Sequence, residues 1–208
     1  MGVPVDPWTM AQTVDAIDAL VKGGHFAHII GVNADKLLQM RDDAEMDAWV
    51  RRCEVVNADG ASMVIAAHKL GADLPERVAG IDLMWELCGL AEREGYRVYL
   101  LGAKAEVVKK AIDVLADKCP GMTICGYRDG YFGNDEFDSV VAEVGETEPD
   151  IVFVGITSPK KERLLSVSVS WEPKVSLWVS VARLTWSLAI SPARPCGCGA
   201  LTLSGCSA

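Results

Sequence analysis

Asp150-Ile151-Val152-Phe153-Val154-Gly155 is the stretch of sequence that decides the fold. Four consecutive apolar residues lie between an aspartate and a glycine, a pattern typical of a short strand that is buried on both faces. Ser158-Pro159 follows closely, and proline is tolerated in the first turn of a helix. The stretch therefore predicts a buried strand that leads directly into a helix.

The same alternation of strand and helix extends from this stretch back to the beginning of the chain. Thr9 and Gln12 have the spacing of a capping box, which predicts a helix start there. Short apolar runs predict strands over residues 26–32, 54–57, 97–101 and 122–125. Helical spacing of apolar residues predicts helices over 35–40, 61–70 and 81–93, and around 107–115 and 137–144. Together these elements predict an α/β fold: a single Rossmann-like domain with a mostly parallel sheet flanked by helices.

Length and charge exclude several classes of protein. The 208 residues fit one domain with a sizeable core. A net charge of −9 opposes a broad phosphate-binding surface, so we expect no nucleic-acid partner. No apolar run reaches the roughly 18–20 residues that span a bilayer. Residues 1–6 lack the features of a signal peptide, and the sequence therefore predicts a cytoplasmic protein.

The cysteines and histidines do not indicate a metal site. Four cysteines are scattered through apolar patterns, as reduced core thiols are: Cys53, Cys88, Cys119 and Cys125. Three crowd into the end of the chain, where the spacing of Cys196 and Cys198 is too short for a typical zinc site: Cys196, Cys198 and Cys206. The histidines lack metal-like spacing and are interpreted as structural: His25, His28 and His68. We expect no metal.

Glycine and polar residues gather where the predicted strands end. In parallel sheets, ligands bind beyond the carboxyl ends of the strands. Five segments meet this condition and are the candidates for a binding site: residues 31–35, 58–62, 102–104, 126–132 and 155–162.

Asp59 is the candidate with the clearest chemistry. It lies at a strand end beside Gly60, where a carboxylate could accept a proton from a sugar hydroxyl as a general base. Aspartate is also a favoured helix N-cap, and spacing alone favours that second interpretation.

Several other residues suit an anionic ligand. The guanidinium of Arg77 matches a diphosphate, although it could instead form a surface ion pair with Glu76 or Asp82. Gly102 and Ala103 precede a helix whose N-terminus could hold an anion. The segment 126–132, with two glycines and two tyrosines, suggests a pocket with aromatic walls or a simple turn. Lys160 and Lys161 stand at a helix start, where the dipole disfavours cations, so they indicate either a bound anion or a solvated face.

In their order and spacing, these segments resemble the WecG/TagA/CpsF glycosyltransferase family. The resemblance covers residues 1–165, the predicted catalytic body. It rests on Gly2-Val3-Pro4-Val5-Asp6, Asn33, Asn57-Ala58-Asp59-Gly60, the segments 76–83, 100–102 and 130–132, Pro149-Asp150-Ile151, and Pro159-Lys160-Lys161-Glu162. The ordered set reverses the preference at Asp59, which the resemblance makes a base.

The resemblance implies an activity. The family transfers N-acetylmannosamine, or its uronic acid, from UDP to a lipid-diphosphate-linked N-acetylglucosamine, with inversion and without a metal or other cofactor. Such an enzyme would serve teichoic acid or surface polysaccharide synthesis at the inner face of the cell membrane.

The resemblance also implies roles for individual residues. Asp59 would deprotonate the acceptor hydroxyl, Arg77 would neutralise the leaving UDP, and Asn33 would contact sugar or acceptor. Gly102 and the Gly130-Tyr131 turn would line the nucleotide pocket. The remaining predicted substrate-binding residues lie in the matching segments: Gly80, Asp82, Lys161 and Glu162.

Two positions depart from the family pattern. Lys161 stands where the family usually has glutamine. The lysine keeps a hydrogen-bond donor at this position but adds a charge. Gly31 stands where many members have threonine, so this chain lacks the threonine hydroxyl.

Residues 166–208 form an aberrant tail with a different composition. This segment contains nine serines and only four charged residues, and it lacks the glycine-rich strand and the basic, amphipathic end expected of the family. Shifting the reading frame by one base lets the codons of 178–208 encode such an ending. We therefore hypothesise a one-base insertion or deletion near codons 165–175, which resequencing would test.

Three alternatives follow for function. The chain is the enzyme described above, or a frameshifted product that is impaired and binds UDP-sugar weakly or not at all, or an unrelated nucleotide-binding α/β domain such as a dehydrogenase. The last ranks lowest, because no G-x-G-x-x-G follows an early strand. Apolar positions on the first helix leave a homo-oligomer open.

Overall fold

One parallel sheet organises the protein. The computed structural model describes residues 2–168 and 177–180. Its six strands have the order β2-β1-β6-β5-β3-β4, and every neighbouring pair is parallel. The strands are β1 (Ala27–Val32), β2 (Val55–Ala58), β3 (Arg97–Gly102), β4 (Thr123–Arg128), β5 (Ile151–Gly155) and β6 (Leu177–Ser180). The predicted α/β, Rossmann-like class is confirmed.

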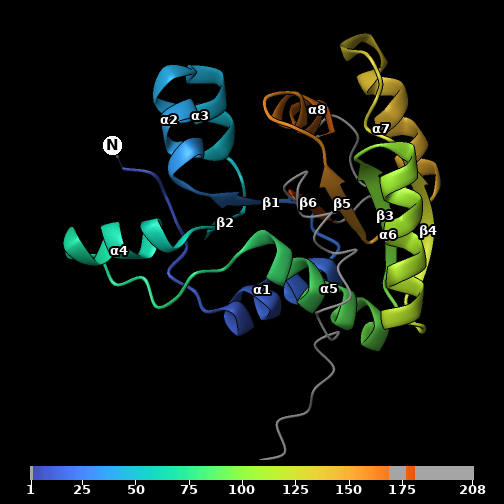
Figure 1. Ribbon diagram of the computed structural model, residues 1–208, viewed down its shortest axis with the longest axis horizontal. Helices are drawn as coiled ribbons and strands as arrows, with labels where there is room; N and C mark the ends of the chain where they lie inside the picture. The colour runs from blue at the N-terminus through green and yellow to red at the C-terminus, as the bar shows by residue number, and fades with distance from the viewer. Residues whose placement is uncertain (1, 169–176, 181–208) are drawn as a thin grey trace, which may run out of the picture.

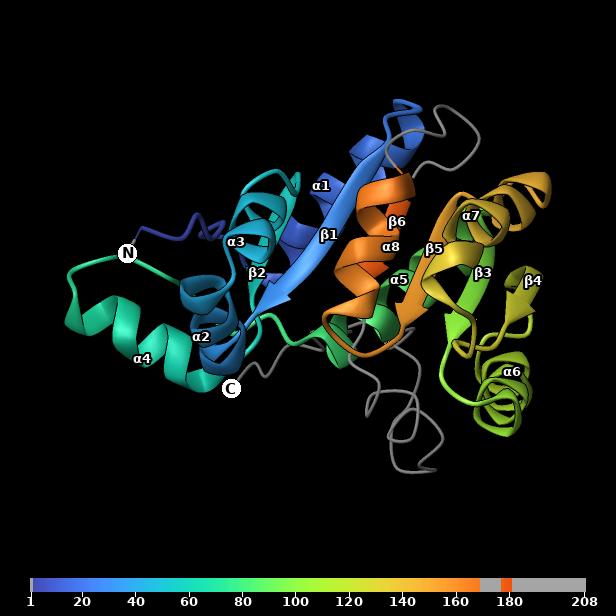
Figure 2. The same cartoon turned by 90° about the horizontal axis from the view of Figure 1, so that it is seen from above.

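Helices cover both faces of this sheet, as Figures 1 and 2 show. One face carries α1 (Met10–Lys22), α5 (Gly80–Glu94) and α6 (Ala105–Lys118). The opposite face carries α2 (Ala34–Asp42), α3 (Ala44–Val50), α7 (Phe137–Glu146) and α8 (Lys160–Ser168). Each layer buries its own apolar cluster against the sheet, with Leu83 and Leu87 in the first and Val140 and Leu164 in the second. All strands except the edge strand β4 are thus mostly buried between the two helix layers, which explains why they are nearly continuously apolar.

The sequence located most of these elements. The capping box of Thr9 and Gln12 is present at the start of α1. The predicted strands and helices up to residue 165 all occur, with ends displaced by a few residues. Three elements were missed: α3, which has only seven residues, the 3-10 helix η1 (Asn134–Glu136), and β6, which lies in the segment predicted to be an aberrant tail.

Strand β6 occupies the middle of the sheet, between β1 and β5. Its four residues are buried, and Trp178 is only 1% exposed. The tail from 166 onward is described only at 166–168, which end α8, and at 177–180. The rest of it, including Cys196, Cys198 and Cys206, lies outside the described residues, and the frameshift stays a prediction.

The cysteines and His28 fit structural roles where they are described. Cys88 and Cys119 are buried, and Cys53 and Cys125 are half-buried. Nε2 of His28 lies 3.0 Å from Oγ of Ser168 in a buried pair. Burial, followed by the charge of Arg52, lowers the pKa of His28 to about 4, so its ring is neutral in the core.

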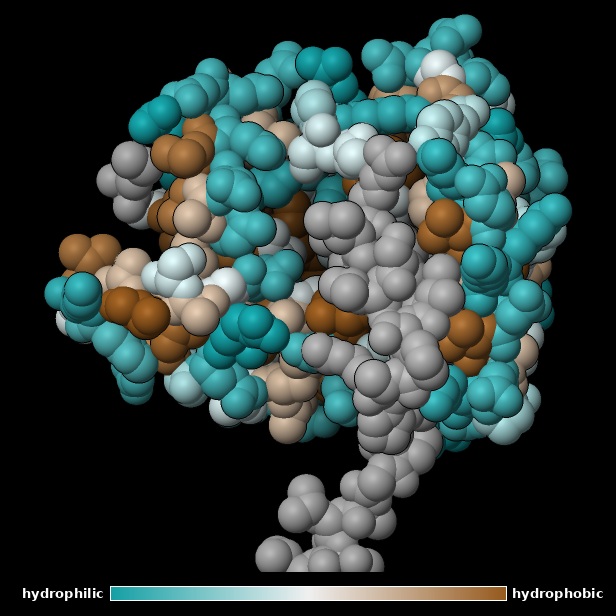
Figure 3. All heavy atoms as spheres, viewed as in Figure 1, coloured by the Kyte–Doolittle hydropathy of each residue, from teal (hydrophilic) through white to brown (hydrophobic). Residues whose placement is uncertain are grey.

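Helix α4 (Ala61–Lys69) stands apart from both layers and projects from the body in Figures 1 and 2. None of its residues is buried. Ile65 is 57% exposed and Leu70, directly after the helix, is 86% exposed, and hydrophobic atoms are visible over this part of the surface in Figure 3. Among the described residues, no helix combines the length and apolar character that crossing a membrane requires.

Candidate active site

Two adjoining clefts open at the carboxyl edge of the sheet. The larger has a volume of about 840 Å³ and the smaller about 520 Å³. They share a wall made by Ala103, Ile156 and Thr157, which follow β3 and β5. The larger cleft is lined by residues from the ends of β1, β2 and β6, including Gly31, Asn33, Asp59 and Ser180. The clefts therefore lie where the parallel topology places a ligand site.

Asp59 enters the larger cleft from the end of β2 on a firmly held backbone. Its N–H donates to the carbonyl of Val32 at 2.9 Å, which fixes it beside β1. Nδ2 of Asn57 donates to the carbonyl of Val78 at 2.5 Å and so holds the loop before α5 against the end of β2. The N–H of Gly80, the first residue of α5, in turn hydrogen-bonds to the Asp59 carboxylate. Asp59 thus faces the positive end of a long helix.

Asp59 does not cap the helix that follows it. The N-cap of α4 is Gly60, and no side chain makes a capping hydrogen bond there. The helix-cap interpretation, which spacing alone favoured, is therefore wrong, because the side chain turns into the cleft instead.

Burial sets the acidity of Asp59. Removal from water raises the pKa of its carboxyl group above the ordinary value of 3.8, although the Gly80 N–H and the charges of Arg77 and Lys161 act in the opposite direction. The carboxylate is thus a stronger base than an exposed aspartate. A raised pKa in a cleft is the property expected of a general base.

Gly31 leaves room for this carboxylate. An ideal Cβ built on Gly31 would lie 2.7 Å from Cβ of Asp59 and 3.1 Å from its Oδ2. Any side chain at residue 31 would therefore require Asp59 to shift.

A buried charge cluster lies on the other side of the larger cleft. Nζ of Lys36 donates to Oε1 of Glu162 at 2.5 Å and to Oγ of Ser158 at 2.7 Å. The Ser158 hydroxyl also donates to Oε1 of Glu162, at 2.7 Å. Lys36 and Ser158 line the cleft, whereas Glu162 lies behind them and is 4% exposed. Glu162, predicted to bind substrate, is placed to position the cleft wall.

We expect Glu162→Gln to lower the free energy of unfolding by about 2 kcal/mol at pH 7, since it removes a buried charge-assisted hydrogen bond. Burial raises the pKa of Glu162, but the charges of Lys161 and Lys36 and hydrogen bonds from Lys36 and Ser158 outweigh it, so the net pKa lies below 4.5. The stabilisation is therefore present above pH 4.5 and is lost as pH falls through the lowered pKa. Urea unfolding between pH 3 and 7 measures this loss, because the free energies of unfolding of wild type and variant should become equal as pH falls. The exposed Glu146→Gln is the control, and a difference that is independent of pH would contradict the prediction.

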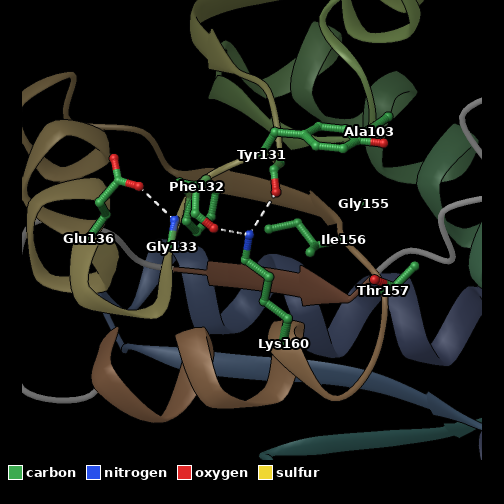
Figure 4. A pocket seen from close by; sticks show the side chains of 10 residues that line it. Ala103, Tyr131, Phe132, Gly133, Glu136, Gly155, Ile156, Thr157 and Lys160 are labelled. Carbon is green, nitrogen blue, oxygen red and sulfur yellow. Dashed lines mark hydrogen bonds between the residues drawn. The ribbon is translucent and has the colours of Figure 1, made fainter.

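The smaller cleft, drawn in Figure 4, combines aromatic, backbone and cationic groups. Tyr131 is 63% exposed at its rim. Nζ of Lys160 donates to the carbonyls of Gly130, at 2.8 Å, and Phe132, and lies 3.9 Å from the centre of the Phe132 ring. Oε2 of Glu136 accepts from the N–H of Gly133 at 2.6 Å. These contacts hold the 130–133 turn in place as one wall of the cleft.

The wall between the clefts is built by close backbone contacts. Gly102 has φ +114°, and a Cβ there would lie 2.7 Å from the carbonyl carbon of Gly155, so only glycine fits. Ala103 has φ +62°, which is a strained conformation for alanine and is held by hydrogen bonds to Gly155 and Gly130. Helix α6 begins directly after this wall without a side-chain cap, and its first residues line the larger cleft. Its uncapped N–H groups suit an anion at the junction of the clefts.

Three other residues that were predicted to bind substrate make structural contacts instead of, or in addition to, lining a cleft. Oδ1 of Asn33 caps α2 by accepting from the N–H of Lys36 at 2.9 Å, while the residue also lines the larger cleft. Arg77 and Asp82 form an ion pair at 3.1 Å, with side chains 46% and 31% exposed, and neither lines the two clefts. The ion-pair alternative for Arg77 is thus observed, although its charge still acts on Asp59.

The two lysines at the start of α8 do not form a solvated face. Lys160 is bound to the 130–132 turn, and Lys161 is 7% exposed in the larger cleft. Lys36 was missed by the sequence analysis, and Ser158 was included only as a member of the candidate segment 155–162. A lysine in a helix is ordinarily exposed, and its partner Glu162 lies 126 residues away, so no local pattern could have indicated the pair.

This fold and these clefts define an α/β protein with a candidate ligand site at the carboxyl edge of a parallel sheet, where a half-buried aspartate lines the larger cleft. The sequence of residues 1–184 matches the model of the glycosyl transferase WecG/TagA/CpsF family, and the chain therefore belongs to that family. Membership identifies a glycosyltransferase of cell-wall polysaccharide synthesis, with a nucleotide-sugar donor and a lipid-linked acceptor in general. The dehydrogenase alternative is thereby excluded.

Proposed function

We propose that this protein transfers N-acetylmannosamine or its uronic acid from UDP to a polyprenyl-diphosphate-linked N-acetylglucosamine, with inversion and without a metal or other cofactor. The product would enter teichoic acid or another surface polysaccharide. The observation that carries the proposal is the Asp59 carboxylate, held in the larger cleft with a raised pKa.

In the proposed reaction Asp59 accepts the proton of the acceptor hydroxyl. The oxygen then forms a bond to the anomeric carbon of the donor, from the face opposite UDP. The bond between that carbon and the phosphate oxygen breaks, and UDP leaves with the electron pair. Developing charge on the diphosphate would be stabilised by the N-terminus of α6. Arg77, which pairs with Asp82 and lines neither cleft, would act on it only through its charge at longer range.

The smaller cleft suits the nucleotide. Tyr131 offers an exposed aromatic ring on which a base can stack, and the Gly130 turn offers backbone groups beside it. With the base there, the diphosphate would reach the wall shared by both clefts, and the sugar would enter the larger cleft beside Asp59.

The acceptor's lipid and the membrane would lie near α4. This helix starts two residues after Asp59 and exposes Ile65, with Leu70 directly after it. Residues 61–70 contain no acidic side chain, and Lys69 lies in the last turn. An apolar surface with a positive charge suits an anionic membrane face, which supports a peripheral location.

Release of UDP from UDP-N-acetylmannosamine or its uronate, in the presence of a lipid-linked N-acetylglucosamine acceptor, tests the proposal. We expect release that depends on acceptor and persists in EDTA. The same assay with a chain carrying the restored reading frame tests the second candidate, a frameshifted and impaired product. Activity of the restored chain alone would favour that candidate, whereas inactivity of both would contradict the proposed reaction.

We expect Tyr131→Ala to weaken UDP binding about tenfold, because a stacking contact with the base is lost. Isothermal titration calorimetry with UDP measures the effect. The matched control is Tyr127→Ala, which removes a tyrosine that is 46% exposed on β4 and outside the smaller cleft. Equal losses in the two variants would remove Tyr131 from the nucleotide site.

A further inference from the structure

A closed ring of three hydrogen bonds forms one wall of the larger cleft. Lys36 and Ser158 line the cleft, and Glu162 lies behind them. Nζ of Lys36 donates to Oε1 of Glu162 at 2.5 Å and to Oγ of Ser158 at 2.7 Å. The Ser158 hydroxyl lies 2.7 Å from the same Oε1. The three side chains come from α2, from the segment after β5 and from α8, so tertiary packing assembles the ring.

The chemistry of the three groups fixes the direction of every bond in this ring. An ammonium group can only donate, and an ionised carboxylate can only accept. Burial raises the pKa of Glu162, but the charges of Lys161 and Lys36 and hydrogen bonds from Lys36 and Ser158 outweigh it, so the net pKa lies below 4.5 and the group is ionised at neutral pH. The Ser158 proton is therefore directed at Glu162, and one lone pair of Ser158 is directed at Lys36.

Two hydrogen-bonding positions remain on this wall for a ligand. Within the described residues, Lys36 uses two of the three N–H donors of its ammonium group in the ring, which leaves one donor. Ser158 keeps one lone pair, which leaves one acceptor. Glu162 does not line this cleft, and its Oε2 is buried without a hydrogen-bond partner in the described part of the chain. The wall thus presents one donor beside one acceptor, on atoms 2.7 Å apart.

This pair of positions discriminates between the polar groups of a sugar. Two hydroxyl groups on neighbouring ring carbons lie about one hydrogen-bond length apart, so one can accept from Lys36 while the other donates to Ser158. A carboxylate offers only acceptors, so it would satisfy Lys36 alone. The planar trans amide of an N-acetyl group points its N–H and C=O in opposite directions, so it cannot meet both positions. The group that fits is a vicinal diol.

The place of the ring in the cleft indicates which diol it meets. Asp59 follows β2 and Ser158 follows β5, and β1 and β6 lie between these two strands. In the proposed reaction the reacting hydroxyl of the acceptor lies beside Asp59, and so does the hydroxyl on the neighbouring carbon. In the donor sugar, by contrast, the 3- and 4-hydroxyls lie across the ring from the anomeric carbon and face the opposite wall.

We propose that Lys36 and Ser158 form a binding site for the vicinal 3,4-diol of the donor sugar, with Glu162 holding both groups in the required orientation. The inference rests on the proposed function and adds two residues to its donor site. N-acetylmannosamine and its uronic acid both carry this diol, so the site recognises the hexose ring rather than the group that distinguishes the two donors.

Equilibrium binding by the full chain tests this inference. Isothermal titration calorimetry is run with UDP, UDP-N-acetylmannosamine and the 3-deoxy and 4-deoxy analogues of that sugar nucleotide, on wild type and Ser158→Ala. We expect each analogue to bind wild type about tenfold more weakly than the parent, the loss typical of one hydrogen bond. Ser158→Ala should no longer distinguish the parent from one of the two analogues, because that hydroxyl has lost its partner. Its affinity for UDP should stay within about twofold of wild type.

Matched variants separate recognition from folding. Ser158→Thr retains a hydroxyl and should retain the discrimination against both analogues. Ser166→Ala removes an exposed serine of α8 outside the larger cleft and should change none of the affinities. Lys36→Met should lose the discrimination at the other hydroxyl, and thermal unfolding by circular dichroism checks that each variant is folded. The comparison of the analogues on wild type needs no variant, so the inference stays falsifiable if Lys36→Met unfolds.

The remaining outcomes assign the wall to another ligand group. A loss of UDP affinity in Ser158→Ala as large as the loss of UDP-sugar affinity assigns it to the ribose diol and overturns the inference. Analogues that bind wild type as tightly as the parent also overturn it, and a raised KM for the lipid-linked acceptor in Ser158→Ala would then assign the wall to the acceptor. A loss confined to one analogue reduces the diol to a single hydroxyl and overturns the inference as stated. Failure of wild type to bind UDP overturns the proposed function, and the inference falls with it.

Discussion

Asp59→Asn is expected to lower the rate of sugar transfer by about a hundred to ten thousand fold, the usual contribution of a general base. Asparagine preserves the shape of the side chain, and its amide oxygen can still accept a hydrogen bond from the Gly80 N–H. It cannot, however, remove the proton from the hydroxyl group of the sugar acceptor. Steady-state UDP release, in whichever version of the chain is active, measures the loss. Because the change is confined to proton transfer, UDP affinity should be nearly unchanged.

Stability should move independently of activity in this variant. The pKa of Asp59 is raised in the folded protein, so its ionised form is less favourable there than in the unfolded chain. Any stability contributed by the protonated form is lost as pH rises through the raised pKa of Asp59. Asp59→Asn should therefore melt at or above the wild-type temperature. The control is Asp35→Asn, an exposed carboxylate in the same cleft, which should cost less than about threefold in rate if it is not the base.

The wild-type pH profile provides a further check on the same residue. A base with a raised pKa loses activity on acidification earlier than an ordinary aspartate would, because it is protonated sooner. Transfer by Asp59→Asn at close to the wild-type rate, or an acidic limb of the pH profile that is unchanged in that variant, would contradict the assignment of Asp59 as the base.

Trp178→Ala is expected to lower the free energy of unfolding by about 3–5 kcal/mol, the usual cost of truncating a large buried aromatic side chain. Trp178 is 1% exposed on the central strand β6 and packs in the cluster under α2, α3, α7 and α8. No other described strand bridges the two halves of the sheet. Urea unfolding followed by circular dichroism measures the change.

Trp178→Phe should recover part of this stability, because an aromatic ring refills part of the cavity. A cost below about 1 kcal/mol for Trp178→Ala would show that the strand contributes little packing. That result would support the prediction that the segment after residue 165 is out of frame and poorly packed. A full cost would show that this part of the segment is a working element of the core.

The sequence predicted the body of the fold because its signals are local. Buried strands such as 151–155 and amphipathic helices such as α6 carry their own apolar periodicity. Helix α3 was missed because seven residues hold too little of a period. Strand β6 was missed because four residues within a serine-rich stretch show no alternation, and only its neighbours in the sheet define it.

The candidate site was predictable in position but not in its contacts. Parallel strands bring their carboxyl ends to one edge, so Asn33, Asp59 and Gly130 could be grouped from their place after strands. Whether a side chain enters the cleft depends on tertiary packing. No spacing indicates that Glu162 lies behind the wall with Lys36. The ion pair of Arg77 with Asp82 was one of two alternatives that the sequence left open, and tertiary packing decides between them.

The position of β6 has a consequence for how the chain is made. β1 and β5 do not pair with each other, and each meets the other half of the sheet only through β6. Ala27 therefore cannot pair within this sheet on the β6 side until Leu177 has been synthesised, and closing so long a loop is entropically slow. Until the ribosome has released residue 180, two half-sheets with open inner edges coexist on one nascent chain, and such edges invite pairing with other chains. Productive assembly in the cell thus depends on the time between synthesis of β5 and emergence of these four residues.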